Sequence, residues 1–342
     1  MSTHEVHLFS PIELRGLTVR NRLWVSPMCQ YSVFAEDGVA TDWHMVHLGS
    51  RAAGGAGLII VEATAVEARG RISARDLGLW DDAQAEALRP VVRFMAEQGA
   101  TPAIQLAHAG RKANVPGAVA PSADAYGTMP VPEALGEADL AGEIAAFTAA
   151  ARRALAAGFK VVEVHAAHGY LLHQFLSPLS NRRTDDYGGT FENRIRFPLA
   201  VAEAVRAVWP AELPVFVRLS ATDWVPGGWD VDQSVELARR LGQLGVDLID
   251  VSSGGLAPEQ QVQIGPGYQV PFAERIRREA GMCVAAVGLI VKPEQAEAIV
   301  AEGRADVVLI ARQALRDPYW PIHAARELGQ AIDIPFQYTR AF

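Results

Sequence analysis

The sequence alternates short apolar stretches with helix-forming segments, and this alternation limits the folds that the chain can adopt. Strands that are continuously apolar belong to parallel sheets covered on both faces. The intervening segments show helical periodicity, and several of them end at a glycine, a common helix stop. We expect eight strands, at residues 22–28, 58–64, 102–108, 160–166, 214–220, 248–254, 283–289 and 306–312. Helices are expected between them, for example at residues 81–99, 142–158, 232–245 and 292–304.

Eight strand–helix units favour a (β/α)₈ barrel over an open sheet. The chain has 342 residues, and barrels of this size routinely fold as one domain. A doubly wound open sheet is the alternative, but no G-x-G-x-x-G follows the first predicted strand. We therefore predict an α/β fold, a single-domain (β/α)₈ TIM barrel over residues 1–342, with an N-terminal β-hairpin in residues 1–21.

Composition and charge exclude several classes of function. The net charge of −8 argues against a nucleic-acid partner. Two cysteines, Cys29 and Cys283, are too few for a disulfide framework, a Cys-rich zinc site or an iron–sulfur cluster. His44 and His47 have helical spacing, but no further ligand completes a metal site, so we predict none. There is no signal-peptide core and no run of about 18 apolar residues, so we expect a cytoplasmic protein without membrane contact.

The stretch HAAHGY places His165, His168 and Tyr170 at the end of the predicted fourth strand, which is the catalytic face of such a barrel. The three side chains can converge only if the backbone turns after the strand. Two imidazoles can then hold an anionic oxygen, and a phenol beside them can give up a proton. Taken alone, an HxxHxY motif is more often a pair of structural histidines beside a packing tyrosine.

Other strand ends of the predicted barrel also carry polar groups. After the seventh and eighth strands, Gly288 permits close backbone approach and Arg312 can clamp a phosphate. A phosphorylated cofactor or substrate is therefore expected there. Residues 113–137 are rich in Pro, Gly and Ala and follow the third strand, where a loop that caps the site is expected.

Four stretches resemble, in chain order, the Old Yellow Enzyme family of FMN-dependent ene-reductases. They are SPMCQYS at 26–32, QLAHAGRKA at 105–113, HAAHGY at 165–170 and LLHQFLSPLSNRRTDDYGGTFENRIRFPL at 171–199. The cysteine of the first stretch and the C-terminal PFQYTR resemble the bacterial thermophilic-like subgroup, which includes xenobiotic reductases.

The resemblance implies a non-covalent FMN, reduced by NADPH or NADH. Arg218 would place a permanent positive charge beside the flavin, where the reduced ring becomes anionic. The FMN-binding residues that the resemblance implies are Ser26, Pro27, Met28, Cys29, Ala63, Gln105, His165, Arg218, Gly288, Ala311 and Arg312.

The resemblance also implies a substrate site and a chemistry. His165 and His168 would hold the substrate oxygen, Tyr31 would lie nearby, and Tyr170 would protonate the α-carbon after hydride transfer to the β-carbon. The substrates would be enones, nitro compounds or quinones. Arg340, from the neighbouring subunit, would complete the site, which implies a homodimer or homotetramer with residues 330–342 at the subunit interface.

Three other functions are weighed against this one. A flavin-binding redox sensor could act through Cys29 without turning over an organic substrate, but it has no need of an enolate-binding site and a proton donor. A dienoyl-CoA-reductase-like protein would carry a cysteine cluster and extra domains. An aldolase barrel would place a Schiff-base lysine at a strand end, whereas Lys160 begins a strand.

Overall fold

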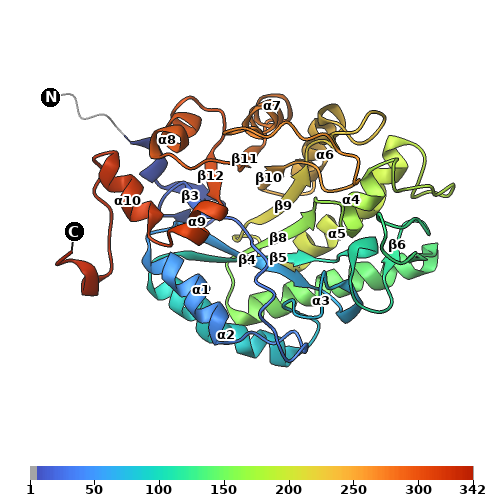
Figure 1. Ribbon diagram of the computed structural model, residues 1–342, viewed down its shortest axis with the longest axis horizontal. Helices are drawn as coiled ribbons and strands as arrows, with labels where there is room; N and C mark the ends of the chain where they lie inside the picture. Colours follow the sequence, from blue (N-terminus) through green and yellow to red (C-terminus); the bar gives the residue numbers. More distant parts are fainter. Residues whose placement is uncertain (1–5, 342) are drawn as a thin grey trace.

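Eight parallel strands close into a barrel at the centre of the computed structural model, which describes residues 6–341 (Figure 1). The strands follow one another around the barrel in chain order, and each pairs with its neighbours in parallel register. They are β3 (Leu23–Val25), β4 (Leu58–Ala65), β5 (Thr101–Ala107), β8 (Val161–Ala166), β9 (Val215–Ser220), β10 (Leu248–Ser252), β11 (Cys283–Ala286) and β12 (Val307–Ile310). The predicted (β/α)₈ barrel is thereby confirmed.

Helices connect the strands and cover the outside of the barrel. The four segments predicted as helices all form helices, with bounds within a few residues of those expected. The helices are α1 (Asp42–Ala53), α2 (Asp82–Glu97), α3 (Leu140–Ala157), α4 (Leu171–Leu176), α5 (Phe191–Val208), α6 (Val231–Gln243), α7 (Val270–Ala280), α8 (Pro293–Ala301), α9 (Arg312–Arg316) and α10 (Trp320–Glu327).

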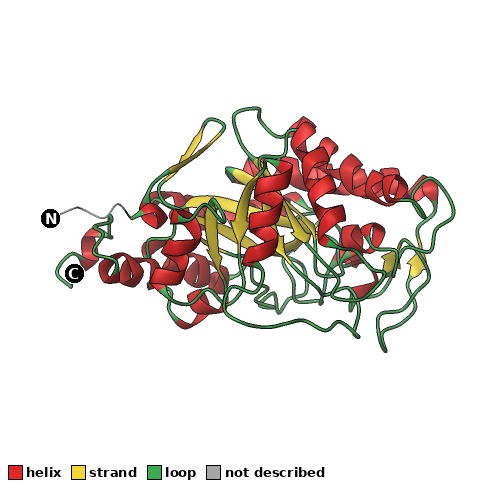
Figure 2. Cartoon of the chain, turned by 90° about the horizontal axis from the view of Figure 1, so that it is seen from above, coloured by secondary structure: helices red, strands yellow, loops and turns green. Residues whose placement is uncertain are grey.

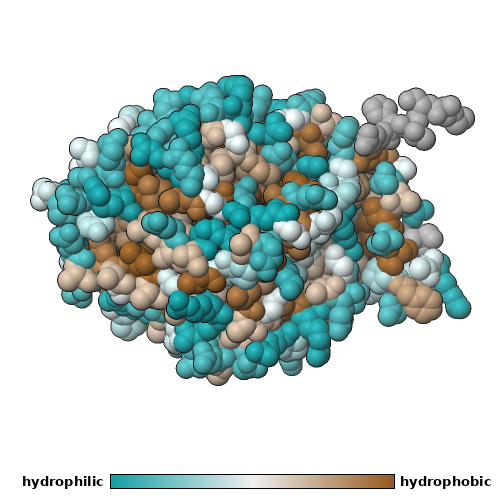
Figure 3. Space-filling model, turned by 180° about the vertical axis from the view of Figure 1, so that it is seen from behind, coloured by the Kyte–Doolittle hydropathy of each residue, from teal (hydrophilic) through white to brown (hydrophobic). Residues whose placement is uncertain are grey.

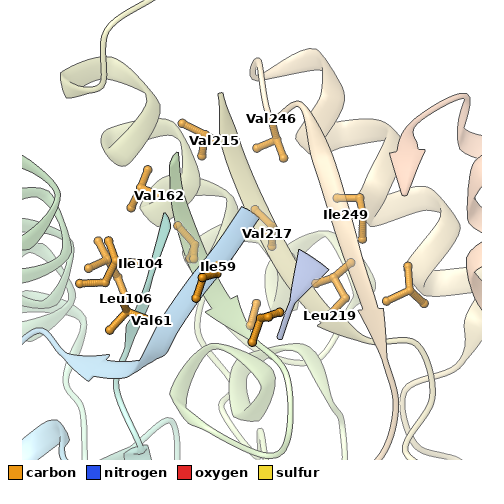
Figure 4. Packing of buried hydrophobic residues seen from close by; sticks show 14 of the residues in the cluster. Ile59, Val61, Ile104, Leu106, Val162, Val215, Val217, Leu219, Val246 and Ile249 are labelled. Atoms are coloured by element: carbon orange, nitrogen blue, oxygen red, sulfur yellow. The ribbon is translucent and has the colours of Figure 1, made fainter. Parts of the chain in front are cut away.

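Two hydrophobic layers hold this arrangement together because alternate residues of each strand point outward and inward. The outward residues pack against the helices, and Figure 4 shows part of this layer, including Ile59, Val162 and Val217. The inward residues include Trp24 and Phe216, whose stacked rings lie 5.8 Å apart between centroids. Both layers are fully buried, so they supply most of the apolar burial that stabilises the fold.

The N-terminal end of the barrel interior is apolar and closed. The hairpin of β1 (Ile12–Leu14) and β2 (Leu17–Val19) belongs to the same buried cluster as Trp24 and Phe216. Figure 2 shows this hairpin on one side of the molecule, with the long loops that follow the strands on the opposite side. Chemistry is therefore restricted to the C-terminal face, as expected for this fold.

Several strands end two or three residues earlier than predicted. The first strand was expected to continue to residue 28, but β3 ends at Val25. Arg312 was expected at the end of a strand, whereas it is the first residue of the short helix α9. The chain leaves the sheet early because the next residues adopt backbone conformations that no strand permits, such as the positive φ angles of Gly288 and Leu289.

The long connection after β5 contains the segment 113–137. It forms a small two-stranded sheet from β6 (Val119–Ala120) and β7 (Glu133–Ala134) beside the loops of the C-terminal face (Figure 2).

The surface seen in Figure 3 mixes polar and apolar side chains. Within residues 6–341, no helix is long and apolar enough to cross a membrane.

Candidate active site

The turn after β8 brings the predicted catalytic side chains together. His168 and Gly169 both have left-handed backbone conformations, with φ of 60° and 72°. The turn lies directly against the loop after β10, since a Cβ on Gly169 would stand 2.2 Å from the carbonyl oxygen of Gly255. As a result the ring of His165 lies 5.1 Å, between centroids, from both the His168 and the Tyr170 rings.

Both imidazoles of this turn are neutral. Burial, together with the nearby charge of Arg218, holds the pKa of His165 and of His168 well below the usual value. The backbone N–H of Ala167 donates to Nδ1 of His165 at 3.3 Å, so the proton of this ring is on Nε2. Nε2 of His168 lies 2.7 Å from the hydroxyl of Ser252. The Nε2–H of His165 is therefore free to bind an oxygen, while Nε2 of His168 shares a hydrogen bond with Ser252.

The phenol of Tyr170 is held protonated in a largely buried position. Burial raises the pKa of Tyr170 above the usual value, and Cys29, Tyr31 and Asp76 raise it further. The ammonium of Lys112 lies 5.0 Å above the Tyr170 ring and 4.6 Å above that of Tyr126, which belongs to the segment 113–137. Lys112 also donates to the carbonyl oxygens of His168 and Gly255, so it ties the turn to this segment.

Cys29 and Tyr31 lie on the loop after β3, at the other side of the site. The Cys29 thiol contacts the Tyr31 hydroxyl and the backbone of Ala63, and burial and the charge of Glu62 raise its pKa. Ala63 sits in a β-bulge of β4, where the register with β5 shifts by one residue between Val61 and Thr64. Tyr31 has a φ of 52° and is 45% exposed.

A polar layer lies inside the barrel beneath the histidines. Gln105 donates to Glu163 at 2.8 Å, and Nε of Arg218 lies 3.0 Å from Asp250. All four side chains are buried. One cation faces two carboxylates, so burial and mutual repulsion raise the pKa of Glu163, and burial raises that of Asp250 against the pull of Arg218.

A cavity of about 170 Å³ extends from Arg218 to the ends of β11 and β12. Its lining includes Arg218 at one end and Gly288, Ala311 and Arg312 at the other. Gly288 has a φ of 128°, and a Cβ there would lie 3.0 Å from the side-chain amide of Gln269. Only glycine therefore fits at this edge of the cavity without strain.

These groups fit a flavin mononucleotide. The cavity offers one cation for a ring that becomes anionic on reduction and another for a phosphate. At the end of β3, the buried hydroxyl of Ser26 finds no hydrogen-bond partner among residues 6–341, which is the condition expected of a group that contacts a ligand. Ser26, Gln105 and Arg218 all project from strand ends or the barrel interior, as the sequence predicted.

Arg340 is the one predicted site residue that the chain does not bring to its own site. It follows the short helix η5 (Phe336–Tyr338), and the Tyr338 hydroxyl lies 3.2 Å from that of Tyr319 beside α10. Residues 333–337 line a pocket with Arg20 and Gly99, which precede the strands rather than follow them. Figure 1 shows this tail extending away from the barrel.

Sequence reasoning missed a second layer of residues behind the site. Nε2 of His173 lies 2.8 Å from a carboxylate oxygen of Asp223, and both side chains are fully buried. Gln269 accepts from Ser253 at 2.7 Å, next to the Ser252–His168 contact. Inward alternation along β8 could have identified Glu163 as an interior carboxylate. No comparable signal identifies Asp223, which follows the end of β9.

Glu67, His108 and Glu143 approach one another closely enough to suggest a metal site. The N–H of Gly110 donates to Nδ1 of His108 at 3.0 Å, so Nε2 carries the ring proton and donates it to Glu67 at 2.7 Å. The guanidinium of Arg69 lies 2.6 Å from both carboxylates. The Nε2 atom of His108, which would have to bind a metal, therefore carries a proton. The guanidinium of Arg69 occupies the place beside the two carboxylates where a metal ion would lie.

Comparison with known proteins identifies the family. A family model described as the NADH:flavin oxidoreductase / NADH oxidase family matches residues 7–330. An NADPH dehydrogenase of Geobacillus sp. (strain WCH70) is 52% identical over 340 residues, which cover 99% of each chain. Morphinone reductase in complex with tetrahydroNAD superimposes with a TM-score of 0.81 at 31% identity, covering 96% of this chain and 92% of that one.

A complex of 2-naphthoyl-CoA reductase with 2-naphthoyl-CoA superimposes with a TM-score of 0.89 at 25% identity. The alignment covers 95% of this chain but only 52% of that longer protein. The family match spans the barrel and all the strand ends that form the site. The chain belongs to the NADH:flavin oxidoreductase / NADH oxidase family, the Old Yellow Enzyme family of FMN oxidoreductases.

Proposed function

We propose that this enzyme is an NADPH dehydrogenase that reduces the C=C bond of α,β-unsaturated carbonyl compounds and related activated alkenes. The observation that carries the proposal is the turn after β8. It holds the neutral ring of His168 and the protonated phenol of Tyr170 each 5.1 Å, between ring centroids, from the neutral ring of His165, beside a cavity suited to FMN. The name of the Geobacillus relative supports NADPH as the reductant, and NADH remains the alternative.

Bound FMN, once reduced by the nicotinamide, supplies the hydride that adds to the β-carbon of the substrate. The cavity residues Arg218, Gly288 and Arg312 would hold it, with Ala311 at the phosphate and Gln105 at the ring edge. Ser26, Pro27, Met28 and Cys29 would contact the ring from the loop after β3, and Ala63 from the bulge of β4.

His165 and His168 would bind the substrate oxygen. Nε2–H of His165 is free to donate. The Ser252 hydroxyl lies 2.7 Å from Nε2 of His168 and 3.3 Å from Oε1 of Gln269, and in the proposed mechanism it donates to Nε2 and leaves Nδ1–H of His168 for the substrate. As hydride adds to the β-carbon, the electrons of the C=C bond move onto this oxygen as an enolate. Each preorganised donor then lowers the barrier by about 2–4 kcal/mol.

Tyr170 would complete the reaction as the general acid. The O–H bond of the phenol breaks and its proton moves to the α-carbon, so that hydride and proton together saturate the C=C bond. Tyr170 regains a proton from water. A phenol of raised pKa is a weak acid, but a carbon-centred enolate is a stronger base, and the nearby Lys112 ammonium stabilises the transient phenolate.

We also propose that neighbouring segments complete the substrate site. Tyr126 shares the Lys112 ammonium with Tyr170, which supports a capping role for the segment 113–137. Tyr31 would contact the substrate from the opposite side. Arg340 lies on an exposed tail that does not reach its own site, so it would act in a neighbouring subunit of a homodimer or homotetramer, with residues 330–342 at the interface.

The redox-sensor alternative gains no support. A sensor cysteine must be present as a reactive thiolate, whereas burial and Glu62 raise the pKa of Cys29.

The proposed function is tested by the visible spectrum of the anaerobic enzyme, followed through addition of NADPH and then of cyclohexenone. We expect the flavin absorbance to bleach with NADPH and to return with the enone. Bleaching without recovery by any activated alkene would refute it.

A further inference from the structure

A fully buried histidine–carboxylate pair, His173 and Asp223, lies directly behind the turn that carries the site. His173 belongs to α4, the six-residue helix that follows the turn, and Asp223 follows β9. Neither side chain has any exposed surface. Neither contacts the cavity proposed for FMN. The pair therefore needs a role other than direct contact with substrate or cofactor.

The protonation of His173 is fixed by its neighbours. The backbone N–H of Gly169 donates to Nδ1 at 2.9 Å, so this nitrogen carries no proton. Nε2 must then carry the proton, and it lies 2.8 Å from Oδ1 of Asp223. The other oxygen of Asp223 accepts from Ser177 at 2.6 Å and from the backbone N–H of Trp229 at 2.7 Å.

The bond to Gly169 controls the geometry of the site because Gly169 lies between His168 and Tyr170. Its peptide is held from both sides by α4: His173 accepts from its N–H, and Gln174 donates to its carbonyl oxygen at 2.7 Å. The left-handed conformation of His168 costs energy because it is not a glycine, so the turn persists only while such bonds hold it.

We propose that His173 and Asp223 are positioning residues, which select the Nε2–H tautomer of His173 and thereby orient Tyr170 and His168 for protonation of the substrate. This proposal rests on the proposed function for its catalytic consequence. Asp223→Asn is the most direct perturbation. The oxygen of the asparagine amide can keep the bonds to Ser177 and Trp229, so its NH₂ group faces Nε2 of His173. Nε2 must then accept a hydrogen bond, and the ring proton moves to Nδ1. There it would point at the N–H of Gly169, and the bond between His173 and Gly169 would be lost.

The tautomer is measured first, because this readout does not depend on activity. In the FMN-loaded enzyme with ¹⁵N-labelled histidine, we expect the nitrogen signals of His173 to report Nε2–H. In Asp223→Asn we expect them to report Nδ1–H. An Nδ1–H signal in the wild-type protein, or an unchanged signal in the variant, would overturn the proposal.

The catalytic consequence is measured by stopped flow on enzyme reduced with dithionite, which bypasses nicotinamide binding. Cyclohexenone can reoxidise the flavin only if the side chains of the turn bind its oxygen and donate a proton. Ferricyanide accepts single electrons and needs no proton donor. For Asp223→Asn we expect the enone rate to fall at least tenfold and the ferricyanide rate to stay within twofold. The matched control is Glu297→Gln, a carboxylate that also accepts from the backbone but does so away from the site, from the N–H groups of His7 and Leu8.

Two variants of His173 keep the test decisive if Asp223→Asn does not fold. In His173→Asn an amide oxygen can replace Nδ1 as the acceptor for Gly169, whereas His173→Leu offers none. We expect the enone rate of His173→Asn to exceed that of His173→Leu at least fivefold at equal FMN content. Equal rates, or a parallel fall of the ferricyanide rate, would refute a positioning role. A wild-type enzyme that no alkene reoxidises would refute the proposed function instead, and the tautomer measurement would still decide this proposal.

Discussion

Replacing Glu163 by glutamine should stabilise the enzyme at neutral and alkaline pH. Glu163 is fully buried, accepts one hydrogen bond from Gln105, and has a second oxygen without a partner among residues 6–341. Burial and the charge of Asp250 raise its pKa, while Arg218 and Gln105 oppose the rise only in part. The folded protein therefore keeps a proton on Glu163 at a pH where the unfolded chain has lost it.

The size of the effect follows from proton linkage. Because the folded state binds one proton more than the unfolded state, stability is greatest below the unfolded pKa of about 4.5 and falls as pH rises towards the folded pKa. The loss is about 1.4 kcal/mol per pH unit, or roughly 3 kcal/mol between pH 5 and pH 7. Glutamine keeps the acceptor for Gln105 and offers an N–H towards Asp250, so the variant should escape this loss.

Thermal unfolding of wild type and Glu163→Gln at saturating FMN, from pH 5 to pH 8, measures the effect. At about 2 °C per kcal/mol for a chain of this size, the difference in Tm should grow by roughly 6 °C between pH 5 and pH 7. Titrations of groups that do not interact with Glu163 cancel in this difference. The exposed Glu13→Gln serves as a control and should show a constant difference. If the difference in Tm between wild type and Glu163→Gln were also independent of pH, Glu163 would not be protonated in the folded protein, and the reasoning would be refuted.

Four further substitutions test the site. Tyr170→Phe should leave flavin bleaching by NADPH unchanged and slow reoxidation by cyclohexenone at least about 100-fold, as measured by stopped flow. Gly169→Ala should lower Tm and abolish enone turnover, because its Cβ would meet the Gly255 carbonyl at 2.2 Å; a normal melting curve would contradict this packing. Cys29→Ala should shift the flavin reduction potential but retain turnover. Arg340→Ala should raise KM for the enone without changing the rate of reduction by dithionite.

The barrel could be predicted from sequence because its signal is repeated and local. Runs such as Val161 to Val164 favour a buried strand whatever surrounds them, and eight such runs allow few topologies. The ends of the strands could not be placed, since backbone conformation there depends on neighbouring loops. His168 and Leu289 adopt left-handed conformations without being glycines, and no sequence pattern predicts that.

The candidate site could be predicted as a set of strand-end residues but not as a geometry. Gln105, His165 and Arg218 were found because the fold brings the ends of parallel strands to one face. His173 and Asp223 were not found, because their contact depends on how the short helix α4 packs against the loop after β9. Arg340 lies outside the reach of its own site, so its role at the site of a neighbouring subunit stays a prediction.

Four histidines of this chain share one arrangement, and the difference among them supports the proposed role of His165 in binding the substrate. In His44, His108, His165 and His173 a backbone N–H donates to Nδ1, so each ring carries its proton on Nε2. In three of them Nε2 faces a carboxylate, at 3.4 Å, 2.7 Å and 2.8 Å respectively. For His165 no carboxylate partner occurs within residues 6–341. The same local structure that holds loops in place thus leaves the Nε2–H of His165 available where a substrate oxygen would arrive, as the proposed function requires.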